Sequence, residues 1–240
     1  MNFEGTPRCK ITLRCNYKCS YCPIKKSNRP EISGDEWIKI LLEWPGDEVI
    51  LEGGEPTIHK DFVQIVNEVG KEKTVRIYSN GSFPLEMLDK LKVKTSWYVS
   101  YHPGHKDSAW DVAHKCFTLQ EYGHRLINVH CNEGPPTATQ DEIDDFQGSG
   151  IELKLERNYY KSDEYIKFKK EQVEHGGYCK YPRTYLDPQG VRYICVKKLE
   201  DGDKSGIVNN QVHPGKLYCT NLAQCNVCDV MVKGVVRGAL

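Results

Sequence analysis

The sequence predicts an α/β protein: a partial (β/α)6 barrel followed by a small C-terminal cysteine-rich domain. Three observations support this prediction. Strand-like and helix-like patterns alternate about six times over residues 9–158. Polar residues stand where the later strands end. After residue 160 glycines, prolines and spaced cysteines replace the apolar patterns. We therefore expect two domains, at residues 1–160 and 161–240.

The alternating region divides into strands and helices by the period of its apolar residues. Alternating or continuous apolar runs predict strands at 9–15, 47–52, 74–81, 96–103, 124–132 and 151–158. Helical spacing predicts helices at 35–44, 61–70, 84–91, 110–122 and 140–150. Because a helix separates each of these strands from the next, the strands should be parallel, with the helices outside, as in an incomplete TIM-like barrel that is open on one side.

Polar residues at the strand ends suit the mouth of such a barrel. Chemistry in parallel α/β barrels gathers at the carboxyl ends of the strands. The residues concerned are Ser79, Asn80, Ser100, His102, His130, Asn132, Glu156 and Arg157.

The C-terminal third differs from the preceding region in amino-acid composition. Residues 161–177 are charged and predict a helix, and residues 185–196 resemble a hairpin around the turn "DPQG". A metal organises so small a segment more readily than a second apolar core does. We expect this appendage to cover the barrel mouth.

Charge and hydropathy exclude several classes of protein. Lysine plus arginine number 33, as do aspartate plus glutamate, so the chain lacks the overall positive field that attracts nucleic acid. No apolar run approaches the roughly 20 residues that cross a bilayer, and the N-terminus lacks the apolar core of a signal peptide. We expect a soluble cytoplasmic protein with no membrane partner.

Eleven cysteines are many for a protein in a reducing compartment, where they indicate metal binding or redox chemistry. Cys15, Cys19 and Cys22 lie within eight residues, directly after the first strand. A structural zinc takes four ligands, so three thiolates leave a metal centre with an open position. Thiolates suit iron–sulfur clusters and zinc. Zinc sites, however, tend to use paired Cys-x-x-Cys arms.

The spacing Cys15-x3-Cys19-x2-Cys22 resembles the signature of the radical S-adenosylmethionine (radical SAM) enzymes, and the resemblance extends along residues 9–158. Tyr21 matches the aromatic position that contacts adenine. "GGEP" matches the segment that holds the amino group of the methionine moiety. "YSNG" and "VSYHP" resemble the strand ends that meet the ribose and the carboxylate. The residues implied to bind cofactor are Tyr21, Gly53, Gly54, Glu55, Pro56, Ser79, Asn80, Ser100 and His102.

The resemblance implies a [4Fe–4S] cluster on the three cysteines, with S-adenosylmethionine bound to the open iron. The chemistry implied is reductive cleavage to a 5′-deoxyadenosyl radical, which takes a hydrogen atom from an unactivated carbon. A reductant such as flavodoxin or ferredoxin is implied as well. Taken alone, "GGEP" favours a plain turn, and Ser79, Asn80 and Ser100 suit capping or turn roles as well as cofactor contacts.

A second cysteine group resembles the family's reduced auxiliary-cluster module, the Twitch version of the SPASM module. Cys179 and Cys195 flank the "DPQG" turn, and Cys225-x2-Cys228 follows. These four are the expected ligands of an auxiliary iron–sulfur cluster, with Cys219 a spare or a substitute. A structural zinc site is the alternative.

The side chains of His130 and Glu156 are candidate bases, because their strands carry polar residues on one face. We expect oxidation of a small-molecule or nucleotide-like substrate, with the auxiliary cluster accepting an electron, by a monomer or homodimer. One alternative is an isomerase, epimerase or rearrangement enzyme that acts on a modified nucleoside. A second is a peptide-modifying radical enzyme, and a third is a zinc-stabilised nucleic-acid-binding module.

Overall fold

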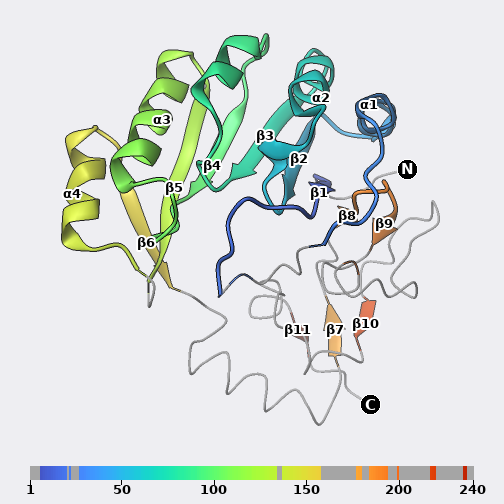
Figure 1. The fold of residues 1–240 in the computed structure, drawn as a ribbon. Helices are drawn as coiled ribbons and strands as arrows, with labels where there is room; N and C mark the ends of the chain where they lie inside the picture. The colour runs from blue at the N-terminus through green and yellow to red at the C-terminus, as the bar shows by residue number, and fades with distance from the viewer. Residues whose placement is uncertain are drawn as a thin grey trace.

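A computed structural model describes residues 6–20, 22, 27–133, 137–157, 177–179, 184–193, 199, 217–219 and 235–236 (Figure 1). Strands and helices alternate along residues 8–157, as the sequence predicts. The strands are β1 (Arg8–Thr12), β2 (Glu48–Gly53), β3 (Thr74–Ser79), β4 (Ser96–Ser100), β5 (Arg125–Glu133) and β6 (Leu153–Arg157). The α-helices are α1 (Gly34–Glu43), α2 (Phe62–Val69), α3 (Ala109–Glu121) and α4 (Gln140–Gly148).

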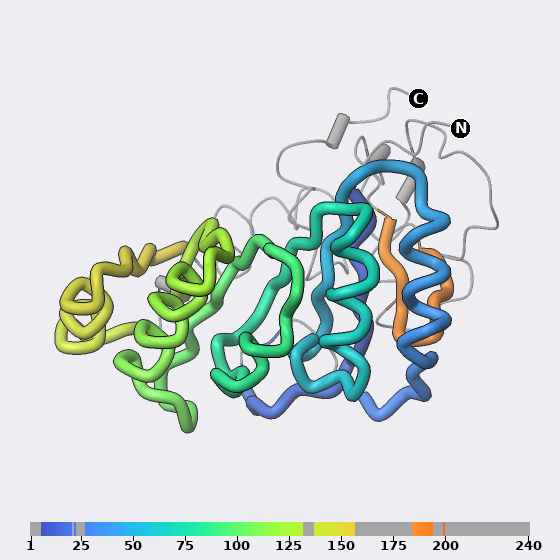
Figure 2. Tube along the Cα trace, turned by 90° about the horizontal axis from the view of Figure 1, so that it is seen from above, coloured from blue at the N-terminus to red at the C-terminus, as the bar shows by residue number. Residues whose placement is uncertain are grey.

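The six strands lie in sequence order and each is parallel to its neighbours. All four α-helices cover the same face of this sheet (Figures 1 and 2). Among the described strands, β6 forms one edge of the sheet and does not pair with β1. This confirms an α/β fold with a largely parallel, open sheet.

Strand alternation separates a buried core from a polar face. Val75 and Ile77 of β3, and Trp97 and Val99 of β4, point toward the helices and are fully buried. They pack with Trp37, Leu41, Phe62, Ile65, Val112 and Leu119 from α1, α2 and α3. Because side chains alternate across a strand, the residues between them face the opposite side of the sheet. Among the described residues no α-helix lies on that side, which carries the polar side chains described below.

Three helices begin at capping boxes, which explains where they start. Ser33, Ser108 and Thr139 each accept a hydrogen bond from the backbone N–H three residues on, and an acidic side chain at that position bonds back. Among the described helices, none is long and apolar enough to cross a membrane.

The helix predicted at 84–91 is shorter and tighter than expected. It is a 3₁₀ helix, η2 (Leu85–Lys90), like the single turn η1 (Pro56–Ile58) that follows "GGE". The side chain of Asn67 explains where η2 ends. Its amide donates to the carbonyl of Lys90 at 2.9 Å and accepts from the N–H of Lys92 at 2.7 Å, in place of further helical bonds.

The predicted hairpin forms, but it belongs to the main sheet. β8 (Tyr185–Leu186) pairs with β9 (Arg192–Tyr193) in antiparallel fashion and with β1 in parallel fashion. Asp187 shapes the turn, because its Oδ1 accepts from the backbone N–H groups of Gln189 and Val191, both at 2.9 Å. We expected this hairpin within the appendage; the open edge of β1 offers backbone groups that it pairs with instead.

A second, antiparallel sheet contains β7 (Gly177–Cys179), β10 (Leu217–Cys219) and β11 (Val235–Val236), with β7 in the middle. Cys179 is paired with Leu217, and Cys219 with Gly177. The strands carrying Cys179 and Cys219 are therefore neighbours. Cys195, Cys225, Cys228 and most of the helix predicted at 161–177 lie outside the described residues. The two-domain division stays a prediction.

Candidate functional site

Two glycines allow the end of β2 to pack against the loop that carries the cysteines. A Cβ atom on Gly53, which has a φ of 148°, would lie 2.0 Å from the carbonyl oxygen of Thr12. One on Gly54 would lie 2.0 Å from the carbonyl oxygen of Arg14. The backbone N–H groups of Gly54 and Glu55 donate to these same two oxygens, each at 2.9 Å. The first two residues of "GGEP" are thus required by close backbone approach.

The third residue of "GGEP" ties the ends of β2 and β3 together. The carboxylate of Glu55 is fully buried and accepts hydrogen bonds from Ser79 Oγ at 3.0 Å and from the N–H of Asn80 at 2.7 Å. Thr57 adds its N–H and its hydroxyl. Burial raises the pKa of Glu55, and these hydrogen bonds offset only part of that effect. Ser79 thus has the turn role that the sequence left open, and Pro56 opens η1 as a buried residue.

Asn80 extends this connection to the cysteine loop. Its Nδ2 donates to Asn16 Oδ1 at 3.0 Å and lies 3.7 Å from Cys15 Sγ. The backbone N–H of Tyr17 also donates to Cys15 Sγ, at 3.4 Å. N–H groups directed at a sulfur favour its thiolate form, which is the form that binds metals.

Cys19 meets a second loop, which leads from β4 to α3. Its Sγ lies 3.2 Å from Nε2 of His105. The His105 ring stacks on Tyr17, with centroids 4.4 Å apart, and His102 meets the edge of Tyr17 at 6.0 Å. A backbone hydrogen bond from Cys22 to Cys19 closes a turn in the cysteine loop. His102 therefore lies near this loop, and its role in cofactor binding stays a prediction, while His105 and Tyr17 were not expected there.

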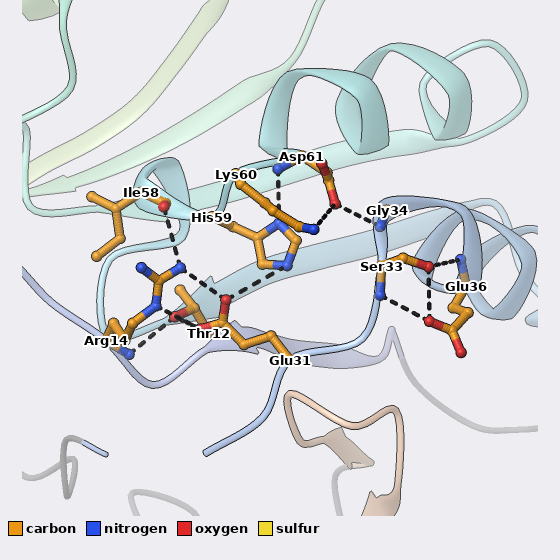
Figure 3. A network of polar contacts seen from close by, with 10 residues as sticks. All are labelled: Thr12, Arg14, Glu31, Ser33, Gly34, Glu36, Ile58, His59, Lys60 and Asp61. Atoms are coloured by element: carbon orange, nitrogen blue, oxygen red, sulfur yellow. Dashed lines mark hydrogen bonds and ion pairs between the residues drawn. The ribbon is translucent and has the colours of Figure 1, made fainter. Parts of the chain in front are cut away.

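Glu31 lies two residues before the N-cap of α1 and binds Arg14, the residue that precedes Cys15 (Figure 3). The guanidinium of Arg14 donates to both oxygens of Glu31, at 2.9 and 2.8 Å, and Thr12 Oγ1 donates to the same carboxylate. Burial alone would raise the pKa of Glu31, but the hydrogen bonds from Arg14 and Thr12 lower it overall. His59 Nε2 lies 3.9 Å from the carboxylate. A cavity of about 420 Å³ adjoins this network, lined by Arg14, Cys15, Asn16, Ser27, Asn28 and Ile58.

The polar face of the sheet gathers residues from β4, β5 and β6. Ser100 Oγ and His130 Nε2 are 2.9 Å apart, and Asn128 Nδ2 donates to Glu156 Oε1 at 3.0 Å. These contacts confirm that Asn128 and His130 share one face of β5. Burial lowers the pKa of His130, although the nearby Glu156 carboxylate acts in the opposite direction. Within the described part of the chain, the buried atoms Asn128 Oδ1 and His130 Nδ1 have no hydrogen-bond partner.

An aromatic pair lies beside this polar group. The rings of Tyr78 and Tyr98 stack with centroids 4.6 Å apart and an interplanar angle of 6°, and Tyr98 is in register with Asn128. The Arg8 guanidinium lies 4.9 Å above the Tyr78 ring. The face thus combines flat aromatic surface with two buried polar atoms that have no hydrogen-bond partner among the described residues.

The described residues contain no group of three or more His, Cys, Asp or Glu side chains placed to hold a single metal ion. The ligands of an iron–sulfur cluster each bind a different iron, so they do not converge on one point. The three cysteine sulfurs, soft ligands as thiolates, fit such a cluster in their chemistry; N–H groups approach that of Cys15, and a histidine ring nitrogen approaches that of Cys19. Tyr21 lies outside the described residues.

Comparison with known proteins agrees with this arrangement. Residues 9–107 match the model of the Radical SAM superfamily. This stretch, which contains the three cysteines, "GGEP" and the β3 and β4 ends, is thus similar to a radical SAM superfamily domain.

Similar proteins include the GTP 3′,8-cyclase of Aquifex aeolicus, 33% identical over 98 residues, which are 35% of this chain and 30% of that protein. The 7-carboxy-7-deazaguanine synthase of Bacteroides thetaiotaomicron is 37% identical over 89 residues, which are 35% of this chain and 48% of that protein. The chain thus matches less than half the length of each.

The fold also resembles that of SuiB from Streptococcus suis, with a TM-score of 0.56 and 16% identity over 85% of this chain and 62% of the other. A structure of SuiB bound to S-adenosylmethionine matches with a TM-score of 0.54 and 15% identity, covering 85% of this chain and 60% of that one. At such identity the likeness concerns the fold alone.

Proposed function

We propose that this protein is a radical SAM enzyme that acts on a small, nucleotide-like substrate. The observation that carries the proposal is the position of Cys15 and Cys19. Cys15 Sγ accepts from a backbone N–H and Cys19 Sγ lies beside a histidine ring nitrogen, on a loop that "GGEP" binds at the carboxyl ends of parallel strands. Cys15, Cys19 and Cys22 would hold a [4Fe–4S] cluster. When bound and reduced, this cluster supplies the electron that cleaves S-adenosylmethionine to a hydrogen-abstracting radical.

The residues of "GGEP" and "YSNG" take two different roles in this proposal. Glu55 and Ser79 are buried against each other, so they position the loop. The backbone of Gly53 and Gly54 keeps that surface free of side chains, as close approach of a cofactor requires. Ser100 and His102, at the end of β4, complete the proposed cofactor-binding set.

The substrate side of the proposal rests on the polar face of the sheet. The stacked Tyr78 and Tyr98 offer a flat apolar surface, and Asn128 Oδ1 and His130 Nδ1 offer buried atoms with free hydrogen-bonding capacity. A heterocyclic base carries both a flat ring and polar edge atoms, and it matches this combination. Two similar proteins bear names that refer to GTP and to a deazaguanine.

His130 is the proposed catalytic base. Burial lowers its pKa, so the imidazole is neutral near pH 7 and can accept a proton. Glu156 lies next to the Asn128 amide and would stabilise the imidazolium that forms. Loss of a proton and an electron from the substrate radical gives an oxidised product. In this proposal an auxiliary cluster on Cys179, Cys195, Cys225 and Cys228, with Cys219 as a substitute ligand, accepts that electron.

The test compares wild type with the Cys15→Ala/Cys19→Ala/Cys22→Ala variant after anaerobic reconstitution. We expect the variant to hold about four fewer irons, because one cubane is lost. It should also form no 5′-deoxyadenosine from S-adenosylmethionine with dithionite or reduced flavodoxin. Cys116→Ala, a buried cysteine on α3, is the matched control and should keep both properties. Cofactor cleavage that survives in the triple variant would disprove the proposal.

A further inference from the structure

We propose that His105 is a positioning residue that donates a hydrogen bond to the sulfur of Cys19 and raises the reduction potential of the cluster held there. The inference rests on the proposed function, because it takes Cys19 as a cluster ligand. His105 and Cys19 are 86 residues apart in the sequence, yet Nε2 and Sγ are separated by 3.2 Å. This is hydrogen-bonding distance for a nitrogen and a sulfur.

The position of the imidazole is fixed by its stacking partner. The rings of His105 and Tyr17 are 4.4 Å apart with an interplanar angle of only 8°. Tyr17 is 3% exposed and lies between Cys15 and Cys19 in the sequence. The same aromatic side chain therefore supports both the cysteine loop and the ring that meets Cys19.

Tyr17 is itself held from the opposite end. Its hydroxyl donates to Asp107 Oδ2 at 2.7 Å, and Lys115 of α3 binds Asp107 Oδ1 at 2.6 Å. A continuous chain of contacts runs from α3 through Asp107 and Tyr17 to His105.

The direction of the hydrogen bond follows from the state of the sulfur. A cysteine bound to iron is a thiolate without a proton, so it can only accept. Nε2 of His105 must then carry the hydrogen. Reduction of a cluster adds negative charge that the ligand sulfurs share, and a donated hydrogen bond stabilises that charge. Hydrogen bonds to the sulfurs accordingly raise the potential.

The experiment is an EPR-monitored redox titration of the full reconstituted chain. The signal is assigned to this cluster by its loss in the Cys15→Ala/Cys19→Ala/Cys22→Ala protein. His105→Phe keeps a ring to stack on Tyr17 but has no N–H, so its midpoint potential should shift to a more negative value at unchanged iron content. His105→Gln retains an N–H donor and should restore part of the shift. His114→Phe, an exposed histidine on α3, is the matched control and should leave the potential unchanged.

A second measurement covers the case in which His105→Phe fails to assemble its cluster. Pulsed EPR of reduced wild type labelled with ¹⁵N-histidine should show coupling between the cluster and one imidazole nitrogen, and His105→Gln should lack it. An unchanged potential in His105→Phe at full iron content, or no such coupling in wild type, overturns the inference while the proposed function stands. A wild-type protein with no cluster signal attributable to the three cysteines overturns both.

Discussion

The backbone N–H of Asn80 donates to Oε2 of Glu55 at 2.7 Å, and this bond joins the ends of two neighbouring parallel strands. The same asparagine contacts the cysteine loop through its side chain. The carboxylate of Glu55 therefore supports the cysteine loop through Asn80, in addition to the direct backbone bond from the Glu55 N–H to Arg14. Disturbing its carboxylate should affect the loop without removing any cysteine.

We expect Glu55→Gln to lower the free energy of unfolding by roughly 1–3 kcal/mol, the cost of leaving a buried polar group unpaired. Whichever oxygen is replaced by NH2, a backbone N–H of Asn80 or Thr57 loses its acceptor. Urea unfolding measures the change. Glu86→Gln, an exposed glutamate in η2, is the control and should have almost no effect. Equal stability of the two variants would contradict the structural role of Glu55.

Gly54→Ala should destabilise the protein by roughly 1–3 kcal/mol through overpacking. Its Cβ would lie 2.0 Å from the carbonyl oxygen of Arg14, so either β2 or the cysteine loop must move. Iron content after reconstitution should fall as well. Gly148→Ala, at the end of α4, has no atom within 4 Å of its new Cβ and should be neutral or stabilising by up to about 1 kcal/mol. Differential scanning calorimetry and an iron assay test both variants.

His124 should make stability depend on pH. Burial lowers its pKa to about 4 from an ordinary value of 6.5, and it accepts a hydrogen bond from the N–H of Thr95. Between these two pH values the unfolded chain binds a proton that the folded chain does not. The stability due to neutral His124 is therefore complete above pH 6.5 and is lost as the pH falls toward 4.

The test is urea unfolding at a series of pH values for wild type and His124→Gln. The variant keeps a hydrogen-bond acceptor but does not titrate, so its stability should fall less steeply between pH 6.5 and 4. Parallel curves for the two proteins would show that His124 is protonated equally in the folded and unfolded states.

His130→Ala should lower the rate of product formation by about 10²–10⁴-fold, the usual contribution of a general base. Formation of 5′-deoxyadenosine without substrate should persist, because His130 is not among the proposed cluster ligands. Quantifying both products by mass spectrometry separates the two effects. His114→Ala, an exposed histidine of α3, should retain the full rate.

The Cys225→Ala/Cys228→Ala variant should cleave the cofactor but form little oxidised product, with a loss of about four irons. Cys219→Ala is the matched comparison and should keep its iron if Cys219 is a spare ligand. A reaction product isomeric with the substrate would remove the need for an electron acceptor and favour the isomerase alternative. A lowered melting temperature in the double variant would instead indicate that the metal holds the appendage together.

The periodicity of the sequence was sufficient to predict the parallel sheet. Apolar residues such as Val75 and Ile77 recur at the period of a strand, and the capped segments between strands recur at that of a helix. It also indicated a polar residue, His130, on β5, and the structure places this residue beside Ser100 at the end of β4. Strand alternation cannot show that Ser79 turns toward Glu55, because that contact depends on the path of the chain after β2.

Periodicity also could not predict the contact between His105 and Cys19. It lies in the loop "PGHKD", where no repeating pattern orients a side chain, and its partner is 86 residues away. The only available signal was the presence of two histidines and an aspartate within seven residues of the end of β4. Likewise, the hairpin at 185–193 was predicted from its turn, but its pairing with β1 depends on which strand edge is accessible.

The pairing of β8 with β1 means that the first and the later parts of the chain protect one another. A fragment ending at residue 160 would present the backbone of Arg8 and Cys9 as an unpaired, apolar strand edge, which other chains can pair with. Such a fragment should be recovered from cells largely as aggregate, whereas one that extends past Tyr193 keeps β1 paired with β8. A stable fragment should therefore end beyond the hairpin, even though the composition of the sequence changes about thirty residues earlier, near residue 160.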